Sequence, residues 1–207
     1  MKTIVFMGDS ITDAGRLMDR NNYMGDGYVT MTAGRIAYDY PGKYQMFNKG
    51  ISGDRMTGVY SRIKRDTINL KPDILTLLIG VNDVWHELNE QNGTTNEKFG
   101  RVLEWYLREV KEALPDVKIV MMEPFILNGS GTEQYFDAFF NEIRVRAATC
   151  KAVAEKLGIP FVTLQDDMIA LAEKCSNDYV LFDGVHPNSA GHELISRKLY
   201  EALKPIL

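Results

Sequence analysis

The sequence has few cysteines, no excess of basic residues and no long apolar run. Its 207 residues include two cysteines, Cys150 and Cys175, whose separation matches no metal-binding pattern, so both are expected to be free thiols. Lysine and arginine total 24 against 28 aspartates and glutamates, a formal net charge of −4, which argues against a general nucleic-acid-binding protein. No apolar stretch approaches the ~20 residues that a membrane-spanning helix needs. We therefore expect no metal site, no nucleic-acid partner and no membrane partner.

Motifs of several other protein classes are also missing. Neither G-x-x-x-x-G-K-[ST] nor G-x-G-x-x-G occurs in the sequence, so a nucleotide cofactor has no support. The G-x-S-x-G motif is absent as well, which argues against the α/β-hydrolase fold. The first eight residues do not have the pattern of a signal peptide, and a cytoplasmic location is therefore expected.

Short apolar segments alternate with helical patterns along the whole chain. The apolar segments predict five strands, at residues 3–7, 44–48, 73–79, 117–122 and 160–164. The helical patterns cover residues 28–40, 55–70, 99–114, 134–157, 166–174 and 188–203. Since no change of composition divides the chain, we expect one α/β domain of residues 1–207 with a parallel sheet of about five strands.

The residues that could carry chemistry follow the ends of the expected strands. Ser10 comes just after the first strand, Gly50 after the second, and Asn82 after the third. Asp183 and His186 lie together in a late loop. In open parallel sheets ligands bind at the carboxyl ends of the strands. Any one of these motifs could be a turn or a helix cap, but all of them at one edge of the sheet indicate a functional site.

Together these residues suit acyl transfer by a serine. A serine hydroxyl is a weak nucleophile at neutral pH and needs a base within hydrogen-bond reach. His186 follows Asp183 by three residues, a spacing that lets the carboxylate bind Nδ1 while Nε2 faces Ser10. The backbone N–H groups of Ser10 and Gly50 and the side-chain amide of Asn82 are the expected donors to an oxyanion.

Other assignments of the base and the nucleophile stay open at this point. His86 follows Trp85 and is a competing base, but no acidic residue stands at a comparable turn spacing, so we interpret it as a pocket-wall or surface residue. Ser52 lies between glycines and is a rival nucleophile. His192, in the last expected helix, is interpreted as structural.

The four motifs, in this order, resemble the four sequence blocks of the SGNH (GDSL-type) hydrolases. The blocks are Gly8-Asp9-Ser10, Gly50, Gly80-x-Asn82-Asp83 and Asp183-x-x-His186. The resemblance implies a flavodoxin-like three-layer α/β/α sandwich and serine esterase chemistry without a cofactor. It also implies that Ser10 is the nucleophile, His186 the base and Asp183 its partner, with Gly50 and Asn82 in the oxyanion hole.

Within that family the chain is most similar to the acetylxylan esterase branch. The similarity lies in the sequence around Ser10, in Gly27-Tyr28-Val29 and in Asn82-Asp83-Val84-Trp85. It implies an acetylated carbohydrate as substrate and a potential homo-oligomer. Candidate substrate-binding residues are Asp9, Tyr28, Arg55 and Trp85; the Trp85 ring could stack on a sugar or pack beneath its loop.

Two alternative functions remain. A lysophospholipase, thioesterase or arylesterase of the same family would use the same serine chemistry with a long apolar acyl groove, which residues 12–27 and 84–98 could form. A non-catalytic flavodoxin-like binding domain would explain an acidic pocket of Asp9, Asp54 and Asp83, but would leave the pair of Asp183 and His186 unexplained.

Overall fold

Five parallel strands form one sheet at the centre of the molecule. The computed structural model describes residues 1–16 and 23–207, so part of the expected loop 12–27, residues 17–22, lies outside the described residues. The strands are β1 (Lys2–Gly8), β2 (Tyr44–Gly50), β3 (Ile74–Leu78), β4 (Lys118–Met122) and β5 (Phe161–Val162), in the spatial order β2-β1-β3-β4-β5. The expected α/β class with a five-stranded parallel sheet is confirmed, although β5 is shorter than predicted.

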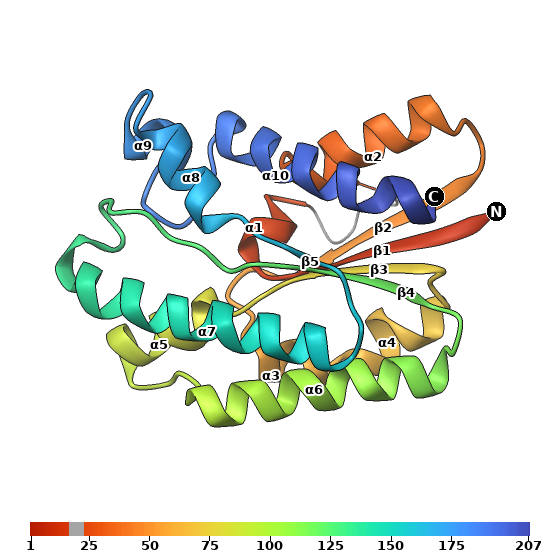
Figure 1. Cartoon of the computed structure of the whole chain (residues 1–207), viewed down its shortest axis with the longest axis horizontal. Helices are drawn as coiled ribbons and strands as arrows, with labels where there is room; N and C mark the ends of the chain where they lie inside the picture. The colour runs from red at the N-terminus through yellow and green to blue at the C-terminus, as the bar shows by residue number, and fades with distance from the viewer. Residues whose placement is uncertain (17–22) are drawn as a thin grey trace.

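Helices cover both faces of the sheet and complete a three-layer sandwich (Figure 1). They are α1 (Ser10–Asp13), α2 (Tyr28–Asp39), α3 (Met56–Ser61), α4 (Ile63–Asp66), α5 (Val81–Glu90), α6 (Asn96–Ala113), α7 (Phe136–Lys156), α8 (Gln165–Ala172), α9 (Asn177–Val180) and α10 (Ser189–Leu203), with short 3₁₀ turns at Ile68–Leu70, Glu133–Tyr135 and Lys204–Ile206. Helices α2, α8 and α10 lie on one side of the strands, and α3, α4 and α6 lie on the other.

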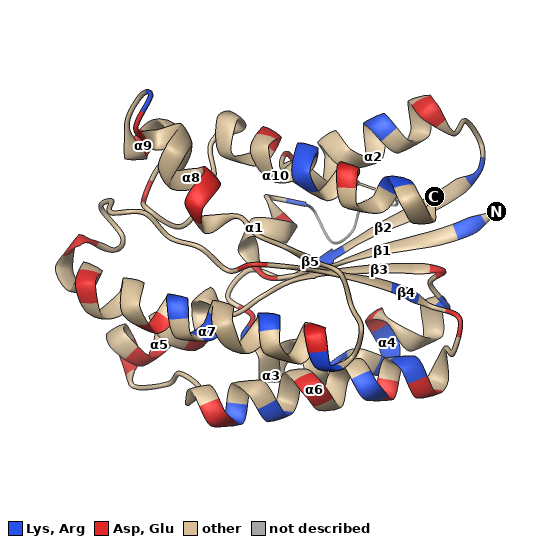
Figure 2. Cartoon of the chain, viewed as in Figure 1, with Lys and Arg blue, Asp and Glu red and all other residues tan. Residues whose placement is uncertain are grey.

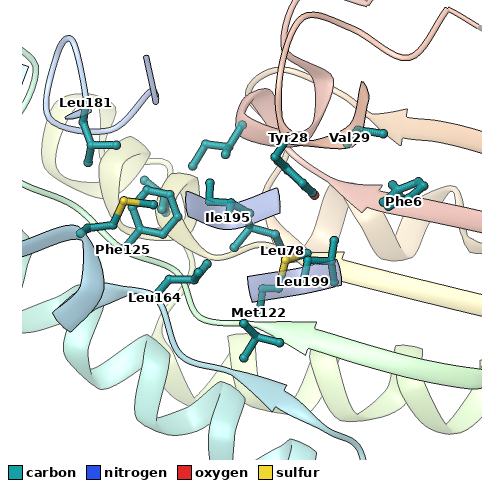
Figure 3. Close-up of a cluster of buried hydrophobic side chains, with 14 of the residues drawn as sticks. Phe6, Tyr28, Val29, Leu78, Met122, Phe125, Leu164, Leu181, Ile195 and Leu199 are labelled. Carbon is teal, nitrogen blue, oxygen red and sulfur yellow. The ribbon is translucent and has the colours of Figure 1, made fainter. Parts of the chain in front are cut away.

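Two apolar cores sit on either side of the sheet because successive strand side chains point to opposite faces. In β1, Ile4 and Phe6 join the core beneath α2 and α10, whereas Val5 and Met7 join the core above α3 and α6. Figure 3 shows the first of these cores, in which side chains from the strands meet side chains from α10. Strands buried on both faces explain why their sequences are almost entirely apolar.

Two helical segments differ from the sequence-based prediction. The expected helix 55–70 is divided into α3, α4 and a 3₁₀ turn. The division falls at Arg62, whose buried guanidinium donates hydrogen bonds to the Gly8 and Lys49 carbonyls at the ends of β1 and β2. Helix α5 occupies residues predicted to form a loop, so Asn82 lies in the first turn of a helix.

The strand order brings three functional loops together. Strand β1 pairs with β2 on one side and β3 on the other, in register at Gly8 with Gly50 and with Leu78. The segments that follow β1, β2 and β3 therefore leave the sheet side by side. Charged side chains lie mainly along the outer helices (Figure 2). Among the described helices none is long and apolar enough to cross a membrane.

Candidate active site

Ser10 lies at the junction between the end of β1 and the first turn of α1. The carboxylate of Asp9 caps this turn, since its Oδ1 accepts the backbone N–H of Ile11 at 3.0 Å. Such a cap supplies one of the acceptors that the first backbone N–H groups of a helix lack. Asp9 therefore fixes the short turn that presents the Ser10 hydroxyl at the edge of the sheet.

A continuous line of hydrogen bonds joins Ser10, His186 and Asp183. The Ser10 Oγ lies 2.8 Å from Nε2 of His186, and His186 Nδ1 lies 2.7 Å from Oδ2 of Asp183. The other oxygen of Asp183 accepts the backbone N–H groups of Val185 and His186, at 2.9 and 2.8 Å. The carboxylate thus holds both the turn and the imidazole ring, in the geometry expected from the three-residue spacing.

The electrostatics of the pair favour a base at His186. Its hydrogen bond to Asp183 raises the pKa of His186 above the ordinary value, although burial acts in the opposite sense. Burial alone would raise the pKa of Asp183, but the hydrogen bonds from the His186 side chain and from two backbone N–H groups lower it below its ordinary value. An ionised carboxylate therefore faces an imidazole that can accept a proton from Ser10.

The three expected oxyanion donors differ in whether the protein already uses their hydrogens in hydrogen bonds. The backbone N–H of Ser10 has no acceptor among the described residues. The Asn82 amide donates one hydrogen to the Asp54 carbonyl at 3.0 Å, which leaves its second hydrogen available. The Gly50 N–H donates to Oδ1 of Asn48 at 2.9 Å, so Gly50 can serve an oxyanion only by sharing that hydrogen.

Gly50 has a clear packing requirement. A Cβ at this position would lie 2.3 Å from the backbone nitrogen of Asp13 and 2.7 Å from the carbonyl carbon of Thr12. Arg16 donates two hydrogen bonds to the Gly50 carbonyl oxygen, from Nε at 3.1 Å and from Nη2 at 2.7 Å. The absence of a side chain thus allows α1 to pack directly on the end of β2.

Two of the expected substrate-binding residues, Asp9 and Tyr28, are enclosed by the protein. Asp9 is 1% exposed because it turns inward to cap α1, and Tyr28 is fully buried because it begins α2 on its core-facing side. The Tyr28 hydroxyl bonds Thr12 Oγ1 at 2.9 Å. Neither side chain can contact a substrate in this structure.

The other two candidates lie at the surface or beside the catalytic loop. The Trp85 ring packs against His186 and Phe139, with centroid distances of 5.8 and 6.1 Å. The Arg55 guanidinium donates to the carbonyl oxygen of Asn92 and to its side-chain oxygen. Trp85 therefore supports the imidazole, while Arg55 ties two loops together.

Ser52 and His86, the alternative nucleophile and the alternative base, do not form a hydrogen bond with each other. The Ser52 hydroxyl donates a hydrogen bond to Oδ2 of Asp13 at 2.9 Å, so it is paired with a carboxylate and not with an imidazole. The His86 imidazole makes no hydrogen bond within the described part of the chain. Ser10 is the serine that meets an imidazole.

A cavity of about 310 Å³ opens beside Ser10 and His186. Its walls include Phe182 and His192, neither of which the sequence-based site contained. The Phe182 ring is 55% exposed and stacks on His186 with centroids 5.6 Å apart. Phe182 directly precedes Asp183, so its proximity to the motif was the available signal. Across residues 1–16 and 23–207 we find no cluster of histidine, cysteine, aspartate and glutamate that could hold a metal ion.

Comparisons with known proteins show which proteins the chain is similar to. Residues 6–194 match the GDSL-like Lipase/Acylhydrolase family. The chain is 32% identical to an acetylxylan esterase from Geobacillus stearothermophilus over 201 residues, which cover 94% of the chain and 90% of that relative. A crystal structure from Parabacteroides merdae, described as a GDSL-like lipase, is 32% identical, covers 98% of this chain and 95% of its own, and superposes with a TM-score of 0.92. The structure of Axe2, an acetylxylan esterase from Geobacillus stearothermophilus, is 28% identical with a TM-score of 0.86 over 97% of this chain and 93% of its own.

Proposed function

Because the chain belongs to the GDSL-like Lipase/Acylhydrolase family, we propose that it removes acetyl groups from carbohydrates with Ser10, His186 and Asp183 as its catalytic triad. It is a carboxylic ester hydrolase, and the proposal adds the residues and the substrate. The observation that carries the triad is the unbroken line of hydrogen bonds from Ser10 Oγ through His186 to Asp183.

In the first half of the proposed reaction, His186 takes a proton from Ser10 and then gives it to the leaving sugar oxygen. Ser10 Oγ attacks the acetyl carbonyl carbon while Nε2 of His186 takes the hydroxyl proton. The carbonyl oxygen becomes an oxyanion that accepts from the Ser10 N–H and the free hydrogen of Asn82. The bond to the sugar oxygen then breaks, and His186 returns the proton to that oxygen.

A water molecule completes the cycle. Nε2 of His186 removes a proton from water, whose oxygen attacks the acetyl-serine ester. The second oxyanion collapses, acetate leaves, and the proton returns to Ser10 Oγ. Throughout, the carboxylate of Asp183 keeps Nδ1 protonated and stabilises the imidazolium that forms twice.

The carbohydrate part of the proposal is supported by similarity. The chain resembles acetylxylan esterase from Geobacillus stearothermophilus over nearly its whole length, both in sequence and in structure. A lipid-type hydrolase of the same family is the competing proposal, and it needs room for a long acyl chain.

The deciding experiment compares acyl lengths in matched variants. The substrates are acetylated xylo-oligosaccharide, p-nitrophenyl acetate and p-nitrophenyl octanoate, and the proteins are the wild type, Ser10→Ala and Ser52→Ala. We expect both acetates to be hydrolysed, the octanoate to be spared, and only Ser10→Ala to abolish turnover. Preferred hydrolysis of the octanoate would keep the triad and refute the carbohydrate assignment. Full activity of Ser10→Ala would refute the triad.

Three further expectations stay predictions. They are a single domain over residues 1–207, a homo-oligomeric state and a cytoplasmic location. Light scattering of the purified protein tests the oligomeric state, and fractionation of the source cells tests the location. The non-catalytic alternative is set aside, because the chain is a member of a hydrolase family.

A further inference from the structure

A second histidine, His192, lines the same cavity as His186. His192 lies in the first turns of α10 and is 9% exposed. Its ring forms part of the wall of the cavity that also contains Ser10 and His186. The proposed triad does not use it, and a buried imidazole beside the nucleophile needs a separate explanation.

The orientation of the His192 ring is fixed by its neighbours. Its Nδ1 accepts the backbone N–H of Tyr28, at the start of α2, with a distance of 3.1 Å. The ring passes so close to Gly27 that a Cβ there would lie 2.6 Å from Cε1 and 2.9 Å from Nδ1. The ring also stacks on Tyr28, with centroids 6.4 Å apart. Gly27, the Tyr28 N–H and the Tyr28 ring thus fix the position of the His192 imidazole.

These contacts define which nitrogen carries the proton. Because Nδ1 accepts a hydrogen bond from an N–H group, it cannot itself be protonated, and the neutral ring must carry its proton on Nε2. Burial and the nearby His186 lower the pKa of His192 to about 4. Around neutral pH, His192 is therefore a neutral ring with a single N–H donor.

That donor is unused by the protein. Nε2 of His192 has no hydrogen-bond partner among residues 1–16 and 23–207. It is also absent from the fully enclosed polar atoms that lack a partner in that part of the chain, so it is open to the cavity or to solvent. An N–H that the protein neither bonds nor encloses is available to donate to a group of a bound substrate.

The position of the cavity indicates which part of the ester enters it. The cavity is bounded by Ser10 and His186, whereas Asn82 and Gly50 do not line it. The ester carbonyl oxygen must point toward the oxyanion donors, and the leaving oxygen must lie within reach of His186 Nε2 to be protonated. With these two atoms placed, the leaving alcohol extends into the cavity.

We propose that His192 forms a subsite for the leaving sugar, in which its Nε2–H donates a hydrogen bond to a hydroxyl or ring oxygen of that sugar. The inference rests on the proposed carbohydrate esterase function and adds the residue that recognises the alcohol. His192 binds the substrate and does not transfer a proton.

The test uses two substitutions that retain different halves of the imidazole. In His192→Asn the amide replaces Nδ1, so it can still accept from the Tyr28 N–H but offers no donor at the position of Nε2. In His192→Gln the amide reaches the position of Nε2 and restores a donor. His86→Asn is the matched control, since His86 lies on α5 and does not line the cavity.

The measurement is the ratio of kcat/KM for a monoacetylated methyl xyloside to kcat/KM for p-nitrophenyl acetate, whose leaving group has no hydroxyl to recognise. Both values come from one sample, so the fraction of folded protein cancels in the ratio. We expect the ratio to fall about tenfold in His192→Asn, the effect of one lost hydrogen bond. It should stay closer to wild type in His192→Gln and be unchanged in His86→Asn.

Two results would overturn the inference. An unchanged ratio in His192→Asn would mean that the ring is only structural. A selective gain with p-nitrophenyl octanoate would mean that the cavity accepts the acyl chain instead of the alcohol. If the wild type does not hydrolyse the acetylated xyloside, the carbohydrate function fails on its own. The same ratio is then measured with glycerol monoacetate and ethyl acetate, and a fall in His192→Asn still supports the subsite while an unchanged ratio refutes it.

Discussion

At the scale of single residues, Asp183 has two tasks that one substitution can separate. One carboxylate oxygen accepts two backbone N–H groups and holds the turn, and the other bonds His186 Nδ1. In Asp183→Asn the shape is retained and the charge is lost. We expect kcat to fall on the order of 10³–10⁴-fold, with Asp178→Asn as a control on an exposed carboxylate.

The pH profile of the same variant gives an independent readout. The bond to Asp183 raises the pKa of His186, and His186 must be neutral to act as a base, so wild-type kcat/KM should rise with pH through that raised pKa. Without the carboxylate the pKa of His186 falls, and the rising limb of the remaining activity should move to lower pH. A limb that stays in place or moves to higher pH would contradict the assignment of His186 as the base.

Gly50 provides a second prediction at this scale. In Gly50→Ala the new Cβ would meet the Asp13 backbone at 2.3 Å, so α1 and Ser10 must shift. We expect a loss of about 1–3 kcal/mol in the free energy of unfolding together with reduced esterase activity. Gly34→Ala, in the exposed middle of α2 with no atom within 4 Å of its Cβ, should instead gain about 0.5–1 kcal/mol. Urea denaturation of the two variants checks both values, and equal stability of the two would refute the packing argument.

The grouping of Ser10, Asp183 and His186 at one site was predictable from the sequence, and the burial of Asp9 and Tyr28 was not. Ser10, Asp183 and His186 stand at fixed spacings after strands or in a tight turn, where local geometry determines their direction. The burial of Asp9 and Tyr28 has no local signal, because the burial of a side chain depends on what packs above it. His192 gave no local signal, since its role arises from α10 meeting the start of α2.

At the scale of elements, Arg62 connects the helical layer to the site. Its guanidinium lies between α3 and α4 and bonds Asp54, Asp66 and the carbonyls of Gly8 and Lys49. Arg62→Leu leaves buried carboxylate and carbonyl groups without their donor, so we expect about 3–5 kcal/mol of destabilisation. The comparison is Arg65→Leu. Arg65 pairs with the same buried Asp66, but its own side chain is largely exposed and Arg62 still binds Asp66 in this variant, so we expect a smaller loss. Similar melting temperatures for the two variants would contradict this account.

The cap of α1 makes stability depend on pH. Burial raises the pKa of Asp9 to about 7, above its value in the unfolded chain. Its protonated form therefore stabilises the fold fully below about pH 4, and this contribution is lost as the pH rises to about 7. Asp9→Asn retains an acceptor for the Ile11 N–H and avoids the buried charge. We expect its free energy of unfolding, relative to wild type, to increase on the order of 4 kcal/mol between pH 4 and pH 8. A difference that does not change with pH would contradict the prediction.

Strands were easier to predict than helix boundaries. A strand buried on both faces is an almost unbroken apolar run, as in Ile74–Leu78. Helix α5 was missed because its first turn contains Asn82 and Asp83, residue types typical of loops, and because Asp83 is buried where it accepts the Met56 N–H. The break at Arg62 depends on carbonyls of two strands distant in sequence. Such long-range bonds leave no periodic pattern.

At the scale of the whole molecule, the sheet order explains how a site can form from residues spread over most of the chain. Ser10 follows the interior strand β1, Asn82 follows its neighbour β3, and the loop with Asp183 and His186 returns just before α10 packs on α2. The fold class follows from alternation of strands and helices, which the sequence displays. The size of the cavity depends on loops and on α10, which only the folded chain defines.

We expect Ser10 to be the nucleophile and His186 to activate it. The most direct measurement is intact-protein and peptide mass spectrometry after treatment with a diethyl phosphate ester that phosphorylates active serines. The account predicts one diethylphosphoryl group per wild-type chain, located on Ser10, with no adduct in Ser10→Ala and much slower labelling in His186→Ala. Labelling of Ser52, or undiminished labelling of His186→Ala, would contradict it.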